Sequence, residues 1–304
     1  MNRREFLRDM AVAGVLTKLP SHLSARPTDA AEAIGQAGLP QLAVITGESP
    51  TRITQEALAA IGGMKRFVSK GDKVIIKPNI GWDRTPELAA CTNPEVVKTL
   101  IELAFEAGAK EVIVTDNSTN SSTRCFARSG IQQAAKNAGA KVLLPNENKL
   151  KKVPLKGEWL KDWEVFSDYL EADKIINVPI AKHHSLSRLT LGMKNWLGAI
   201  GGPRNQLHQR LDEGMVDLAA FFKPCLTVLD AYRILTRNGP QGGRTSDVKL
   251  AKTVAASTDV VAIDAFGASL FEIKPQELAY LPLAAKRGLG EINLEKLQIE
   301  KRTV

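Results

Sequence analysis

Short apolar runs rich in Val and Ile alternate with longer segments of helical periodicity between residues 41 and 301, and this alternation restricts the fold more than any other feature. Strands that alternate with helices are typical of α/β proteins, in which helices cover a parallel sheet. We therefore predict one α/β domain over residues 41–300, with a mostly parallel, Rossmann-like sheet flanked by helices. The predicted strands are residues 42–46, 73–77, 111–115, 141–144, 174–178, 226–229, 253–256 and 297–301. The predicted helices are residues 53–67, 94–107, 125–138, 261–270 and 276–285.

Two segments of this domain carry additional signals. Asn93 and Pro94 suit the N-cap and the first position of the helix at residues 94–107, and Gly108 follows its end. Residues 145–172 are irregular and contain Trp159 and Trp163 among many charges. We predict that this insertion forms a strand pair or a lid over the core.

The first residues carry a signal of another kind. Arg3 and Arg4 are followed by Phe6, Leu7 and a short apolar segment at residues 10–16, which resembles a twin-arginine export signal. We predict that residues 1–33 are a signal peptide and linker, with the twin-arginine export machinery as a partner and a periplasmic, bacterial-type location. The apolar segment is too short for a permanent membrane anchor. A cytosolic amphipathic helix is the alternative.

The charge balance narrows the class of ligand. The formal net charge is +8, but the Lys and Arg residues are interspersed, and only 5% of the residues are aromatic. Surfaces that bind single-stranded nucleic acids combine a basic groove with stacking rings, so we expect no nucleic-acid partner. An acidic small molecule, a phosphate or an anionic membrane surface accounts for the charge equally well.

The three cysteines, Cys91, Cys125 and Cys225, are far apart in the sequence and form no CxxC motif. We therefore expect no cysteine-ligated iron-sulfur cluster in this chain. One disulfide of undetermined pairing and three buried, inert thiols are both compatible with this spacing.

Three histidines, His183, His184 and His208, gather in residues 183–208. Histidine acts as an acid, a base or a metal ligand near neutral pH. The same region carries five basic residues, which are Lys182, Arg188, Lys194, Arg204 and Arg210. This clustering indicates a bound anion or a metal ion. The alternative is a structural region in which the basic residues are solvated and the histidines satisfy backbone groups.

Polar residues also follow several predicted strands, where ligands bind in open α/β sheets. These residues are Lys77, Asn79, Asp116, Asn117, Asn177, Lys182, His183 and Asp230. Lys77 suits a carboxylate or phosphate, or a base, but a Lys at a sheet rim can also lie in water. Asp116 and Asp230 suit a metal or a histidine partner, but Asp at a strand end also caps turns. The glycine-rich loop at residues 238–244 suits either an anion or a plain turn, and the GxGxxG, P-loop and GxSxG motifs are absent.

An ordered set of motifs resembles one family. The segments are IIKPN at residues 75–79, TNPEVV at 92–97, AGAK at 107–110, INVP at 176–179, KHHS at 182–185, TLGMKN at 190–195, LG at 197–198, NGP at 238–240 and DVVAID at 259–264. They follow one another as in the domain-of-unknown-function 362 family, and the resemblance covers about residues 41–290. Some members are described as iron-sulfur-centre proteins, because they carry ferredoxin-like cysteine clusters. This chain lacks those cysteines, although a redox partner subunit could hold a cluster. By position, the resemblance singles out Lys77, Asn79, Lys182, His184, Lys194, Asn195 and Asp264.

The leading hypothesis is an exported enzyme of undefined, redox-related reaction that binds a small anionic substrate or cofactor in a basic cleft. Its predicted binding residues are Lys77, Asn79, Lys194, Asn195 and Arg204, its predicted catalytic residues are His184, His208 and Lys182, and its predicted metal or orienting residues are Asp230 and Asp264. The rival is a non-catalytic periplasmic binding or assembly protein for an anion, a metal or a metallocofactor. A purely structural accessory role is the third hypothesis.

Overall fold

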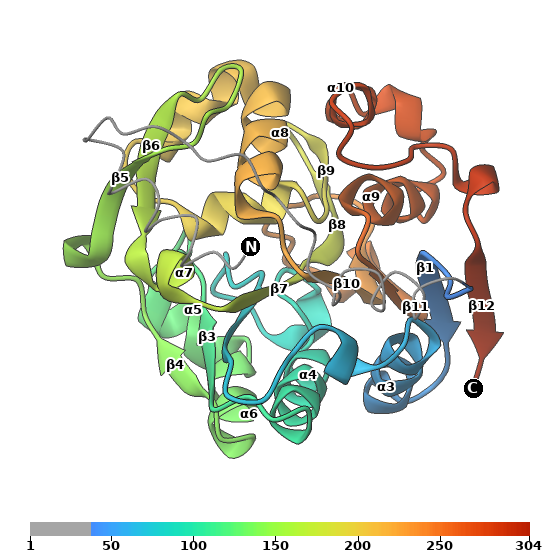
Figure 1. Cartoon of the computed structure of the whole chain (residues 1–304). Helices are drawn as coiled ribbons and strands as arrows, with labels where there is room; N and C mark the ends of the chain where they lie inside the picture. The colour runs from blue at the N-terminus through green and yellow to red at the C-terminus, as the bar shows by residue number, and fades with distance from the viewer. Residues whose placement is uncertain (1–37) are drawn as a thin grey trace, which may run out of the picture.

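The computed structural model describes residues 38–304, and in this part of the chain a ten-stranded mixed sheet has helices on both faces (Figure 1). The strand order is β12-β1-β11-β10-β7-β2-β3-β4, with β8 paired to β10 and β9 paired to β8. Six of these nine pairings are parallel, which confirms the mostly parallel α/β fold. The strands are β1 (Leu42–Thr46), β2 (Lys73–Pro78), β3 (Glu111–Thr115), β4 (Lys141–Leu143), β7 (Lys174–Val178), β8 (Ile180–His184), β9 (Arg188–Thr190), β10 (Leu226–Leu235), β11 (Val248–Ser257) and β12 (Ile299–Thr303).

Two cores lie on opposite faces of the sheet, because successive side chains of a strand point to opposite sides. Ile76 of β2 belongs to the core that contains residues of α3 (Pro50–Ala60), α4 (Pro94–Glu106), α5 (Ser122–Arg128) and α6 (Ile131–Asn137). Ile75 belongs to the other core, with residues of α7 (Ser167–Glu171), α8 (Leu211–Phe222), α9 (Val260–Ser269) and α10 (Tyr280–Lys286). The short 3₁₀ helices are η1 (Met64–Arg66), η2 (Pro86–Leu88), η3 (Glu147–Lys149), η4 (Lys194–Ala199), η5 (Arg204–Arg210), η6 (Thr245–Asp247), η7 (Pro275–Glu277) and η8 (Leu294–Lys296).

Local sequence signals explain several helix ends. Asn93 caps α4 by accepting a hydrogen bond from the Glu95 backbone N–H at 3.0 Å, as predicted. The helix predicted at residues 125–138 is divided into α5 and α6 at Gly130, whose φ of 74° ends a helix without a steric penalty.

The elements predicted from the sequence did not include α7, β8, β9 and α8. The strands β8 and β9 carry polar residues in place of an apolar run, and α8 contains Gly214, which lowers helix propensity. This glycine brings α8 close to Trp159, since a Cβ atom there would lie 3.0 Å from the Trp159 ring.

The insertion at residues 145–172 contains an antiparallel strand pair, β5 (Leu150–Pro154) and β6 (Asp162–Phe166), as predicted. The pair packs on the segment that follows η4. Trp163 Nε1 donates to the Gly201 carbonyl at 2.9 Å, and the Gly201 N–H donates to the Glu164 carbonyl at 2.9 Å. Whether the insertion closes as a lid stays a prediction.

The predicted signal peptide and linker at residues 1–33 lie outside the described residues. None of the helices within residues 38–304 combines the length and apolar character needed to cross a membrane.

Candidate functional site

The carboxyl ends of β7, β2 and β3 lie side by side in the sheet, where the sequence predicted a site. Lys77 is the register partner of Asn177, and Asp116 directly follows β3. Lys77 shares a face with Ile75, because side chains alternate along a strand. This face is the one covered by α8 and η4. Separate strands therefore bring these polar residues together beneath η4.

Lys77 and Asp116 form a buried ion pair at this position. Lys77 is fully buried, and its Nζ donates to Asp116 Oδ1 at 2.5 Å and to the Pro78 carbonyl at 3.0 Å. Asp116 Oδ2 also accepts from the Ile80 N–H at 2.6 Å. Burial lowers the pKa of Lys77, whereas Asp116 opposes this effect. Gly198 covers the pair so closely that a Cβ atom there would lie 1.8 Å from Asp116 Oδ1.

Asparagines connect this pair to Lys182. Asn79 Nδ2 donates to Asn195 Oδ1 at 3.0 Å, and Asn195 Nδ2 donates to Asn177 Oδ1 at 2.8 Å. Asn79 Oδ1 in turn accepts from Lys182 Nζ at 2.9 Å, and Lys182 also donates to the Ala90 carbonyl. Burial lowers the pKa of Lys182 to about 8. The network therefore holds the predicted binding residues Lys77, Asn79 and Asn195 in fixed positions beside Lys182.

Lys194 is the next cation, and its environment differs from those of the other two lysines. The residue is 7% exposed, and among residues 38–304 its buried Nζ has no hydrogen-bond partner. Burial lowers the pKa of Lys194 to about 8, and the positive charge of Lys182 adds to this, whereas Asp212 opposes it. The buried hydroxyl of Thr190 likewise has no partner within the described chain. Thr190 is the register partner of Lys182 in the β8–β9 pair, so both side chains lie on one face of that hairpin.

Arg204 lies close enough to Lys77 to lower the pKa of that lysine. Its guanidinium donates to the carbonyls of Asn117 at 2.9 Å, Leu197 at 3.2 Å and Ser118 at 3.1 Å. We refer to Lys77, Lys182, Lys194 and Arg204 as the cationic cluster. Asp116 is the carboxylate that hydrogen-bonds to it within the described residues, so positive charge is in excess.

The three histidines have different environments. The Nδ1 of His184 accepts from the N–H groups of Leu186 at 3.1 Å and Ser187 at 3.4 Å. Burial lowers the pKa of His184 to about 3, with contributions from Lys194, Lys182, His208 and His183. His184 is therefore neutral at pH 7, with its proton on Nε2. His183 binds the glycine-rich loop at residues 238–244, since its Nδ1 accepts a hydrogen bond from the Gly239 N–H at 3.1 Å. His208 is exposed, with Nδ1 3.2 Å from the Asn205 carbonyl oxygen.

Asp230 and Asp264, for which a metal or orienting role was predicted, both accept hydrogen bonds from backbone N–H groups. Asp230 accepts from the N–H groups of Asn93 at 2.7 Å and Tyr232 at 3.0 Å. Asp264 accepts from the N–H groups of Gly192 at 2.6 Å and Met193 at 3.0 Å, and from the Tyr280 hydroxyl at 3.2 Å.

No group of three or more His, Cys, Asp or Glu side chains that could hold a metal ion occurs within residues 38–304. The backbone donors already occupy both carboxylates. Asp264 binds the backbone of the turn that precedes Lys194, and the metal and orienting roles of both aspartates stay predictions.

The cysteines are free thiols. Cys91 and Cys125 are buried, and Cys91 Sγ donates to the Trp82 carbonyl at 3.2 Å. Burial raises the pKa of Cys91 to about 11 and that of Cys225 to about 12, so these thiols are protonated at neutral pH.

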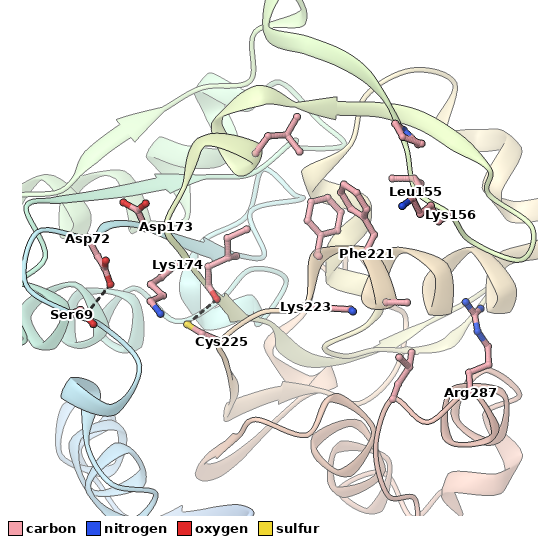
Figure 2. Close-up of a pocket in the computed structure, with 16 residues that line it drawn as sticks. Ser69, Asp72, Leu155, Lys156, Asp173, Lys174, Phe221, Lys223, Cys225 and Arg287 are labelled. Carbon is pink, nitrogen blue, oxygen red and sulfur yellow. Dashed lines mark hydrogen bonds between the residues drawn. The ribbon is translucent and has the colours of Figure 1, made fainter. Parts of the chain in front are cut away.

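A cavity of about 800 Å³ lies near the amino ends of the strands, on the side of the sheet opposite to the carboxyl ends (Figure 2). Lys174 and Cys225, at the amino ends of β7 and β10, line it together with Asp72 and Phe221. None of the site residues predicted from the sequence lines this cavity. The polar residues and this cavity are therefore two separate features.

Sequence reasoning missed Thr190 and Gly198. Both occur in the motifs at residues 190–195 and 197–198, but a hydroxyl without a partner and a close approach to Asp116 depend on the folded contacts. The sequence therefore marked both positions as parts of motifs, but it did not show what either residue does.

The chain is similar to known proteins in sequence and in fold. The chain is 29% identical over 251 residues to the thylakoid-associated protein sll1697 of Synechocystis, and this match covers 77% of this chain and 73% of the relative. The solved apoprotein of lactate racemase from Thermoanaerobacterium thermosaccharolyticum is similar with a TM-score of 0.46 and 13% identity. That similarity covers 76% of this chain, which spans 57% of the racemase chain. The family described as domain of unknown function (DUF362) matches residues 74–269, a range that includes every member of the cationic cluster. The chain therefore belongs to the DUF362 family, as its ordered motifs predicted.

Proposed function

We propose that the cationic cluster binds a small anion that carries a carboxylate or phosphate group. An ammonium has three N–H donors. Lys77 and Lys182 each use two of them on protein acceptors, so each has a third N–H without a protein acceptor. An anion would also supply negative charge beside Lys182 and Lys194, whose positive charges act on each other.

The observation that carries this proposal is the Lys194 ammonium. Its Nζ is buried without an acceptor among residues 38–304, although a buried charge normally has a partner. The nearby Thr190 hydroxyl, also without a partner, is a second group that a ligand would satisfy. Two buried polar groups without a protein partner, in the same region as Lys182, are what a site for a polar ligand would contain.

We further propose that the protein is an enzyme that acts on this anion. His184 supports the proposal as a neutral hydrogen-bond donor, because backbone N–H groups occupy its Nδ1 and its Nε2 carries the proton. Lys182 and Lys194, with pKa values of about 8, are the buried groups best suited to exchange a proton near neutral pH. His208 remains the exposed alternative.

A non-catalytic anion carrier is the second candidate. The observation that favours it is the occupied Nδ1 of His184, which removes one lone pair that a general base would use. A carrier and an enzyme share the same binding residues, so turnover of the bound anion distinguishes them.

Export to the periplasm and association with a redox subunit also remain proposals. They rest on the twin-arginine motif at Arg3 and Arg4 and on the family resemblance. Cell fractionation of the full chain and of an Arg3→Lys/Arg4→Lys variant tests export. An unchanged distribution of the variant between periplasm and cytoplasm would refute it.

Calorimetric titration with inorganic phosphate and with succinate tests the anion site. We expect Lys194→Met to weaken binding by about tenfold or more, as expected for a lost charge-assisted hydrogen bond. Lys98→Met is the matched control, since Lys98 is partly exposed on α4 and pairs with Glu102. Native mass spectrometry of the untreated protein then tests for a co-purified anion or metal ion. Absence of binding of both anions, or equal binding by Lys194→Met, would overturn the proposal.

A further inference from the structure

Three buried lysines belong to the cationic cluster, and their hydrogen bonds give them different chemistry. Lys77 donates to Asp116 and Pro78, and Lys182 donates to Asn79 and Ala90. These bonds require N–H groups and hold both nitrogens in fixed orientations. Lys194 Nζ makes no such bond within residues 38–304. Its nitrogen is therefore the one whose lone pair is available when it loses a proton.

The surroundings of Lys194 favour the neutral amine. The side chain is 7% exposed, and Lys182 places a second positive charge nearby. A desolvated lysine beside another cation is an activated nucleophile. Lys194 acts electrostatically on His184, which is half-buried, and the exposed His208 acts on the same histidine.

We propose that Lys194 forms an imine with the carbonyl carbon of a small 2-oxo carboxylate held in the cationic cluster. This inference rests on the proposed anion site and names its substrate class. The neighbouring Lys182 retains one N–H for the carboxylate, while Lys194 attacks the adjacent carbonyl. Because the two lysines are neighbours, the charged group and the carbonyl must be close together in the ligand, as they are in a 2-oxo acid.

The step balances without any further reactant. The Lys194 lone pair forms the N–C bond, and the π electrons of the carbonyl move to oxygen, which takes a proton. The nitrogen lone pair then forms the C=N bond as that oxygen leaves. Both hydrogens of the neutral amine end in the released water, and protonation of the imine gives the electrophilic iminium.

Trapping with cyanoborohydride tests this step. The full chain is incubated with pyruvate or glyoxylate and the reductant, and peptide mapping then locates the secondary amine that results. We expect the adduct at Lys194, its suppression by inorganic phosphate, and its loss in Lys194→Arg, which keeps the charge but cannot form an imine. Lys98→Arg serves as the control and should label like the wild type. If Lys194→Arg does not fold, peptide mapping of the wild-type chain alone shows whether the secondary amine lies at Lys194.

Two results would overturn the inference, and they separate it from the proposed function. Succinate binding without an adduct at Lys194 refutes the imine and leaves the anion site intact. Adducts confined to exposed lysines, together with no binding of succinate or phosphate, refute both proposals.

Discussion

Replacement of Lys194 by Met should make the protein more stable while it weakens anion binding. Met has a similar length and adapts to irregular core space, so we expect no large cavity. Lowering of the Lys194 pKa from 10.5 to about 8 by burial corresponds to a cost of about 3 kcal/mol, at roughly 1.4 kcal/mol for each factor of ten in proton affinity. The buried ammonium pays this cost because it has no acceptor within residues 38–304.

The pH dependence follows from the direction of this pKa change. The unfolded chain keeps the Lys194 proton up to about pH 10.5, whereas the folded protein releases it near pH 8. The unfolded state therefore binds more protons between these values, and wild-type stability rises with pH in that window. The gain from Lys194→Met should be largest below pH 8 and should shrink as the pH approaches 10.5.

Urea unfolding at pH 7 and near pH 10 measures this effect. We expect Lys194→Met to raise the free energy of unfolding by up to about 3 kcal/mol at pH 7, or Tm by about 6–12 °C. The control Lys98→Met should change it by less than about 0.5 kcal/mol. A loss of stability in Lys194→Met at pH 7 would refute the reasoning, because it would mean that the ammonium has a stabilising partner.

Three further perturbations test the surrounding site. Asp116→Asn leaves the Lys77 ammonium buried without its carboxylate and should cost about 3–5 kcal/mol in urea unfolding; a loss below about 1 kcal/mol, the scale of an exposed pair, would contradict it. Gly198→Ala places a Cβ atom 1.8 Å from Asp116 Oδ1 and should weaken succinate binding measured by calorimetry, whereas Gly81→Ala, with its nearest contact at 3.7 Å, should not. Equal affinities of the two variants would show that the close approach has no role. Burial raises the pKa of Asp264 from 3.8 to about 7, so the folded state binds more protons in this window and stability contributed by this group falls as the pH rises through it. Asp264→Asn should reduce that slope, and an unchanged slope in unfolding measured between pH 4 and pH 7 would be the contrary result.

The sequence located most strands and the edge of the sheet at which polar residues gather. Both follow from local information, because an apolar β-branched run forms a buried strand and parallel strands end at a common edge. Lys77 and Asn177 could be placed together for this reason, and the structure pairs them in register. Among the elements that were missed, β8 and β9 carry polar residues and α8 contains Gly214, and both features weaken the local pattern.

The tertiary structure alone decided which polar groups are satisfied. Lys182 donates a hydrogen bond to Asn79, which is 103 residues away in the sequence. Asn195 donates to the carbonyl of Lys77, which is 118 residues away. No local pattern predicts such partners, because hydrogen bonds between distant segments depend on how strands and loops pack. The sequence therefore placed Lys77 and Lys182 after predicted strands. Only the folded contacts determined that Lys194 lacks an acceptor within residues 38–304, and that the backbone N–H groups of Gly192 and Met193 occupy Asp264.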